Sequence, residues 1–348
     1  MAEVWFAIVA LMFTLYVVLD GFDLGAGALQ RWVARDDAER RQVIQAIGPY
    51  WDANEVWLLA GGGALFVAFP RALASGLSGF YLAIFLVLWL LIVRGIAIEC
   101  RHHFAEPLFR SFSDTAFGIA SALLATFFGV ALGNILRGLP LRADGWFELS
   151  LFTDLSAHPP VGILDWYTVL VGGFALAALM MHGAVFLAWK TSGEVERRSR
   201  SLASRFCVAV AVLWPLMTLL TVEVNPELFA RFVRRPQAWL AVIVALAGLT
   251  GAILSLSREK PRVAFLGSSA FLAGLLVATA TSLFPDLLPS IEKGSLSLTA
   301  YNSGADPRGL HVALRWWLAG FPLAIGYFWL LFKLHRGKNR SAIYAEHS

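Results

Sequence analysis

The sequence predicts an all-α membrane protein, and three observations lead to this fold class. Of its 348 residues, 58% are hydrophobic and only 15% are charged, whereas a soluble domain of this length needs a far more charged surface. Thirteen Trp and 26 Phe suit a bilayer, where aromatic side chains populate the interfaces. In addition, the chain repeatedly reaches the length of about 20 mostly apolar residues that a helix needs to cross the hydrocarbon core.

Nine stretches meet this requirement, and they follow one another along the whole chain. They are 3–28, 54–73, 77–99, 114–136, 163–189, 202–222, 237–256, 263–284 and 310–333. The fourth and the seventh carry small residues that allow close contact between helices. The longest connecting loops, 137–162 and 285–309, are too short to form a domain. We therefore expect residues 1–348 to form a single integral-membrane helical domain.

The distribution of Lys and Arg predicts how these helices are oriented. One set of loops and the C-terminal tail hold 18 of these residues, and the opposite loops hold eight. Basic loops tend to remain in the cytoplasm, so we expect the N-terminus outside and the C-terminus in the cytoplasm. This topology also accounts for the net charge of +4, and nothing in the sequence resembles a nucleic-acid-binding module.

Two carboxylates, Asp20 and Asp23, interrupt the first apolar stretch. A charge at the bilayer centre costs on the order of 3 kcal/mol on insertion scales. The spacing of three residues places both side chains on one face of a helix. Two interpretations remain open: the aspartates cap a helix break or pair with an arginine, or they line a hydrated path for protons or cations.

The second stretch is preceded by "GPYWDANEVW", in which Asp52 and Glu55 also stand three residues apart. Acidic residues are favoured at a helix N-terminus, and this pair has the outline of a capping box. Glu99 lies at the end of the third stretch, five residues after Arg94, which we expect to supply a partial counter-charge.

Capping does not explain why five carboxylates gather in the cytoplasmic third of the first three helices. Carboxylates that lie close together in such a site are candidates for taking up and passing on protons. We therefore predict a proton path formed by Asp23 and Asp52, with Asp20, Glu55 and Glu99 in support.

Other chemistry-bearing residues give weaker signals. His182 is the only histidine well inside an apolar stretch, and without a second ligand we expect it to be a hydrogen-bonded core residue. Cys100 and Cys207 are expected to be reduced thiols. The sequence has no metal-binding spacing, nucleophile motif, P-loop or dinucleotide fingerprint.

Several blocks of the sequence resemble subunit II of the cytochrome bd quinol oxidases. They are "DGFDLGAG", "GPYWDANEVWLLAGGGALFVAFP", "GFYLAIFLVLWLLIVRGIAIECR", "HGAVFLAWKTSGE" and "FPDLLPS" followed by "SLTAYN". They occur in order from the first helix to the last, so the resemblance covers nearly the whole chain. The "WDxNEVW" block adds Trp51, Asn54 and Trp57 to the residues expected to support the site.

The resemblance implies nine helices, arranged as two four-helix bundles and one peripheral helix, in a bacterial cytoplasmic membrane. It implies a partner, subunit I, that carries haems b and d and the quinol site, in a complex that oxidises quinol and reduces O2 to water. It also implies that this chain supplies no haem ligand, and that Asp52 and Asp23 lie on a proton or water path. Small single-helix accessory subunits and a bound quinone or lipid remain open.

Two rival interpretations differ from an oxidase subunit in class. A secondary transporter with carboxylates that bind H+ or Na+ would usually show inverted halves with a broken helix in each, and the sequence shows no such pairing. A purely structural scaffold subunit predicts that neutral replacements of Asp23 and Asp52 leave turnover intact in an assembled complex.

Overall fold

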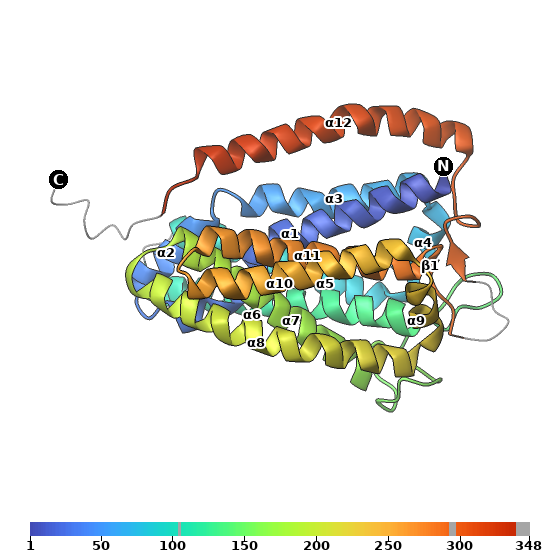
Figure 1. Ribbon diagram of the computed structural model, residues 1–348, viewed down its shortest axis with the longest axis horizontal. Helices are drawn as coiled ribbons and strands as arrows, with labels where there is room; N and C mark the ends of the chain where they lie inside the picture. The colour runs from blue at the N-terminus through green and yellow to red at the C-terminus, as the bar shows by residue number, and fades with distance from the viewer. Residues whose placement is uncertain (104–105, 292–296, 339–348) are drawn as a thin grey trace.

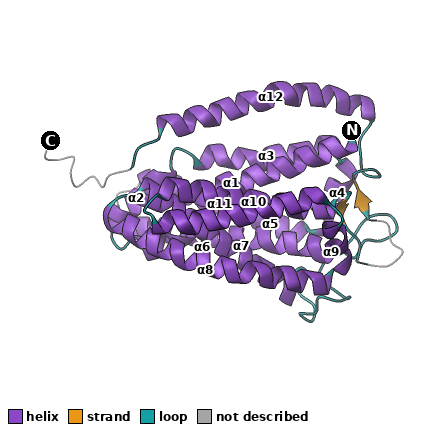
Figure 2. Ribbon diagram, in the orientation of Figure 1, coloured by secondary structure: helices purple, strands orange, loops and turns teal. Residues whose placement is uncertain are grey.

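The computed structural model describes residues 1–103, 106–291 and 297–338, which form twelve helices and one short pair of strands (Figures 1 and 2). The first half contains α1 (Ala2–Val33), α2 (Asp37–Ile47), α3 (Trp51–Ala68), α4 (Pro70–Gly79), α5 (Tyr81–His103) and α6 (Pro107–Arg137). The second half contains α7 (Trp166–Lys190), α8 (Gly193–Val224), α9 (Pro226–Val233), α10 (Pro236–Ser257), α11 (Pro261–Leu283) and α12 (Pro307–Leu334). Strands β1 (Asp286–Leu288) and β2 (Leu298–Thr299) pair antiparallel.

Eight helices in the described ranges are long and apolar enough to cross a membrane: α1, α5, α6, α7, α8, α10, α11 and α12. The stretch expected at 54–73 is divided instead, because α3 ends at Ala68 and α4 begins at Pro70. Proline lacks the N–H that a continuing helix needs and disfavours helical backbone in the residue before it. The first turns of α3 also carry polar residues, and α3 is not among the eight.

Helix α1 is the centre of the bundle and packs against α3, α6, α7 and α11. Its closest crossing is with α7, where Gly25 lies against the backbone at Leu179 and Gly183. A Cβ atom on Gly25 would overlap the carbonyl of Leu179, and one on Gly183 would overlap the backbone of Gly25. Only glycine permits this approach, which brings the polar face of α1 deep into the protein.

The end of the molecule opposite α2 is formed by the two long loops, on the right in Figure 1. Backbone hydrogen bonds join these loops, since Leu139 donates to Pro289 and Ile291 donates to Leu139. Beneath them, the fully buried Arg137 and Asp165 form an ion pair, and Asp165 also caps α7. This end is therefore fixed by contacts that are distant in sequence.

Helix α12 lies along the outside of the bundle, at the top of Figure 1, and is largely exposed. Its inner face meets α3 at Trp57, whose ring lies 5.3 Å from that of Phe328. Near its C-terminal end, Phe332 stacks on Tyr50 with the ring centroids 4.7 Å apart. Aromatic contacts therefore attach α12 to the start of α3.

Candidate functional site

One face of α1 carries a buried polar stripe. Tyr16, Asp20, Asp23, Gly27 and Gln30 are all buried, and their spacing places them along one side of the helix. The two aspartates could be identified from the sequence, whereas Tyr16 and Gln30 were not predicted. The signal that would have found them is the repetition of polar or small residues at the same helical spacing.

Asp20 forms a buried ion pair with Arg94 of α5. The guanidinium donates to both carboxylate oxygens, with Nη1 2.7 Å from Oδ2 and Nη2 2.5 Å from Oδ1. Both side chains are 0% exposed. Glu55 of α3 lies on the same cation, with its Oε1 3.3 Å from Arg94 Nη2. Arg94 therefore joins three helices, and the interpretation that an aspartate of this stretch pairs with an arginine is correct for Asp20.

Asp23 lies one turn further along α1 in a different environment. It is fully buried, and its Oδ2 accepts a 2.7 Å hydrogen bond from Asn54 Nδ2, which also donates to the carbonyl of Leu19. Within the described ranges, Asp23 has no ion pair, and its Oδ1 and the Oδ1 of Asn54 have no hydrogen-bond partner. Buried polar atoms are nearly always paired, so these two oxygens require water or a proton.

The other two predicted carboxylates do not join this interior group. Asp52 on α3 and Glu99 on α5 are exposed on the surface of the chain. These two acids therefore lie outside the buried group, Asp52 in the first turn of α3 and Glu99 in the last turns of α5. Likewise, Arg94 forms its ion pairs with Asp20 and Glu55, which come from other helices, and among the described residues it forms none with its sequence neighbour Glu99. Sequence spacing could not distinguish these partners.

The capping box expected from Asp52 to Glu55 is absent at the start of α3. This helix begins at Trp51, and its N-cap residue, Tyr50, makes no side-chain capping hydrogen bond. Asp52 is therefore already inside the first turn, where a carboxylate interacts favourably with the helix dipole. Glu55, one turn later, is turned toward Arg94.

The aromatic residues of the same block position α3. Trp51 lies alongside Gly95 of α5, one residue after Arg94. Trp57 is buried against α12, and its Nε1 has no hydrogen-bond partner in the part of the chain that the structure covers. Asn54 lies between them on α3 and contacts α1. Through these three side chains, the start of α3 contacts α5, α12 and α1.

His182 is a hydrogen-bonded residue of the protein core. His182 is fully buried, with its Nδ1 2.7 Å from Ser268 Oγ and its Nε2 2.9 Å from the carbonyl of Val18, as expected for a core histidine. Cys100 and Cys207 are free thiols. Among the described residues, no group of three or more His, Cys, Asp and Glu side chains could hold a metal ion.

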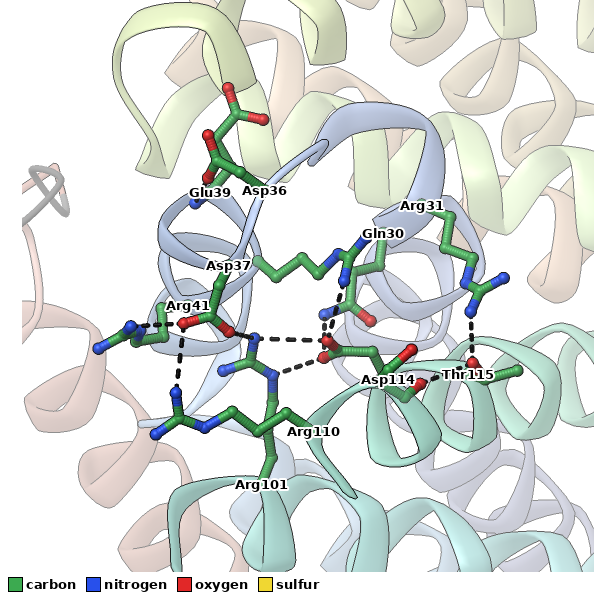
Figure 3. A network of polar contacts seen from close by, with 12 residues as sticks. Gln30, Arg31, Asp36, Asp37, Glu39, Arg41, Arg101, Arg110, Asp114 and Thr115 are labelled. Atoms are coloured by element: carbon green, nitrogen blue, oxygen red, sulfur yellow. Dashed lines mark hydrogen bonds and ion pairs between the residues drawn. The ribbon is translucent and has the colours of Figure 1, made fainter. Parts of the chain in front are cut away.

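An ionic cluster closes the polar stripe at its C-terminal end (Figure 3). Asp114 of α6 is buried, and its carboxylate accepts hydrogen bonds from Gln30 Nε2 at 3.1 Å and Arg101 Nε at 2.5 Å. Arg101 also reaches Asp37 of α2, with Nη2 2.9 Å from Oδ1. These contacts fix the ends of α1, α2, α5 and α6 to one another.

The acidic members of α2 have altered pKa values. Burial opposes the shift at Asp37, but the hydrogen bond from Arg41 and the charges of Arg101, Arg41 and Arg110 lower its pKa. Burial likewise opposes the shift at Glu39, whose pKa is lowered by hydrogen bonds from Arg198 and from the Arg35 backbone N–H. Both residues therefore hold a proton less readily in the folded protein than in the unfolded chain.

This linkage predicts a loss of stability in acid. The two carboxylates stabilise the fold above their unfolded pKa values, about 3.9 for Asp and 4.3 for Glu, and this contribution is lost as the pH falls through the lower folded values. We expect the thermal midpoint of the purified protein complex to decrease below about pH 4. The double variant Asp37→Asn/Glu39→Gln should have a lower midpoint at neutral pH and a weaker acid dependence, and identical pH profiles would contradict the linkage.

Together these features define a class of protein: a multi-pass helical membrane protein with an interior charge network. The model of the family described as cytochrome bd terminal oxidase subunit II matches residues 1–335. The chain therefore belongs to the cytochrome bd terminal oxidase subunit II family.

Named relatives and a solved structure agree with this family. The cytochrome bd-I ubiquinol oxidase subunit 2 of Escherichia coli (strain K12) is 31% identical, covering 89% of this chain and 87% of that protein. The cytochrome bd ubiquinol oxidase subunit 2 of Bacillus subtilis (strain 168) is 30% identical, covering 93% of this chain and 92% of that protein. The structure of bd oxidase from Geobacillus thermodenitrificans matches with a TM-score of 0.73 at 19% identity, covering 96% of this chain and 98% of that one.

Proposed function

We propose that this chain works in the bacterial cytoplasmic membrane as subunit II of a quinol:oxygen oxidoreductase complex of the respiratory chain. In this proposal a partner, subunit I, carries haems b and d and the quinol site. The present chain supplies no haem ligand, and it assembles with subunit I and conducts protons from the cytoplasm toward it. Small accessory subunits and a bound quinone or lipid are compatible with this arrangement.

The proposed topology has nine membrane-spanning helices, with α3 added to the eight that meet the length and apolarity requirement. They form two four-helix bundles, and α12 is the peripheral helix. The N-terminus lies outside and the C-terminus in the cytoplasm, as the distribution of basic residues favours. With this orientation, the ionic cluster around Asp114 lies at the cytoplasmic end of the bundle.

The observation that carries the proton path is the contrast between two aspartates on the same helix face. Asp20 is neutralised by the guanidinium of Arg94 at 2.5 and 2.7 Å, so it serves as a fixed ion pair. Asp23 is equally buried, but it has only a neutral amide as a partner and one oxygen without any within the described ranges. A buried carboxylate of this kind can gain and lose a proton without breaking an ion pair.

The proposed route enters at Asp52, which is exposed at the start of α3, and continues past Glu55 to Asp23. Asn54 holds the Asp23 carboxylate against α3. Glu99 adds negative charge at the same end, which attracts cations toward the entrance. The surrounding helices are positioned by Asp20, Arg94, Trp51 and Trp57.

The replacement Asp52→Asn tests the entrance of this path. We expect quinol-driven oxygen consumption by the purified complex to fall several-fold, and proton uptake to slow in parallel, because a positioned proton-transfer group contributes up to about 10²–10⁴-fold and water can partly replace one at the surface. The visible haem spectrum should remain unchanged, since no haem contact is altered.

The matched control is Glu223→Gln, which neutralises an exposed carboxylate at the other end of the bundle and should leave turnover unchanged. Equal turnover in the wild type and the Asp52 variant would remove Asp52 from the path. Haem absorption in this chain purified without its partner would overturn the proposed division of roles.

A further inference from the structure

A cavity of about 220 Å³ lies between the ends of α2, α7 and α12, and none of the described residues that line it is acidic. Tyr50, Lys190, His335 and Lys338 contribute to its wall. None of the carboxylates of the proposed proton path is among the described residues that line it. It lies where these helices end, on the side of the molecule occupied by α2 (Figure 1), which is the level of lipid headgroups if α7 crosses a membrane.

Lys190 is the unusual residue of this cavity, because its side chain is buried and has no carboxylate partner among the described residues. The residue is only 2% exposed. Its Nζ donates to Tyr50 Oη at 3.0 Å and to the carbonyl of His335. Both acceptors are neutral, and an ammonium group has three N–H donors. In the described part of the chain, no acidic side chain forms an ion pair with Lys190.

The neighbouring groups do not cancel the charge of Lys190. Lys338 is already compensated, since its Nζ lies 2.7 Å from Glu196 Oε2. The rings of Trp189 and Tyr50 lie 4.4 and 5.4 Å from Lys190 Nζ, and such contacts stabilise a cation without cancelling its charge.

We propose that this cavity binds a phosphate group, held by the ammonium group of Lys190. Buried charges in proteins are normally paired, and an anion entering the cavity would provide the missing partner. Basic pockets between membrane helices are a recognised environment for anionic lipid headgroups. The same chemistry would accept free inorganic phosphate, and the experiment distinguishes the two sources.

The test uses the complex purified together with its partner subunit. In the first arm, the complex is reconstituted in nanodiscs of phosphatidylcholine containing phosphatidylglycerol, released gently, and analysed for retained phosphatidylglycerol by native mass spectrometry. In the second arm, inorganic phosphate is added to delipidated complex, and the shift of the thermal midpoint is measured. Retained phosphatidylglycerol identifies a lipid headgroup, whereas a phosphate-dependent shift alone identifies free phosphate.

Lys190→Met should reduce the retention or the affinity about tenfold or more, because a charge-assisted contact is lost. Lys190→Arg keeps the charge and should retain binding. Lys333→Met is the matched control, since Lys333 lies exposed on α12 over Trp329 and outside the cavity. The proposal fails if the wild type binds in neither arm, or if Lys190→Met binds as well as the wild type.

Discussion

Replacing Arg94 by leucine is expected to prevent stable assembly of the complex or to lower its stability severely. The substitution would leave the fully buried Asp20 carboxylate without its cation and would remove the partner of Glu55. Breaking one side of a buried ion pair typically costs about 3–5 kcal/mol. The measurement is the yield of the complex in size-exclusion chromatography, together with its thermal midpoint.

A second replacement separates the charge effect from the loss of the arginine side chain. The double variant Asp20→Asn/Arg94→Leu removes both charges of the main pair and should recover much of the yield. The control Arg71→Leu removes an exposed arginine that donates to the carbonyl of Asp144 and should assemble normally. An Arg94→Leu complex with wild-type yield and midpoint would show that the ion pair is not essential.

Replacing Asp23 by asparagine is expected to reduce turnover by about two orders of magnitude, within the range for loss of a positioned proton-transfer group, in a complex that still assembles. The change is nearly isosteric, and the new side-chain oxygen can still accept the hydrogen bond from Asn54. The amide cannot take up a proton at this position. Oxygen consumption with a soluble quinol and single-turnover proton uptake measure the two consequences.

Asp23→Glu provides the conservative test, because it restores a carboxyl group one methylene longer and should recover part of the turnover. Asp20→Asn should behave differently and affect stability more than proton uptake, since Asp20 is an ion-pair partner. If an assembled Asp23→Asn complex consumed oxygen and took up protons at the wild-type rate, the scaffold interpretation would be preferred.

Much of the architecture could be predicted because it depends on local properties. The length and apolarity of segments such as Trp166–Lys190 are set by the thickness of the bilayer, and the family follows from ordered sequence blocks. The placement of Asp20 and Asp23 on one helix face follows from helical geometry alone. His182 was also predicted as a core residue, because an isolated histidine in an apolar helix needs only two neighbouring polar groups.

The partners within the site could not be predicted, because they depend on how helices rotate against one another. Arg94 is 74 positions from Asp20, and nothing near either residue specifies the pairing. Glu99 and Arg94 lie five positions apart on α5, so they project from different sides of the helix. The capping interpretation failed for a local reason: α3 begins one residue before Asp52, and helix boundaries are the least certain feature of a sequence pattern.

The glycine crossing between α1 and α7 limits how this subunit can work. With the backbone of Gly25 pressed against Leu179 and Gly183, α1 has little freedom to slide, rotate or rock relative to its neighbour. A carrier that alternates its access between two sides needs such rigid-body motion. Here the carboxylates lie on a helix that is held in place. Any proton movement past them must therefore depend on side-chain rotation and on the rearrangement of water molecules.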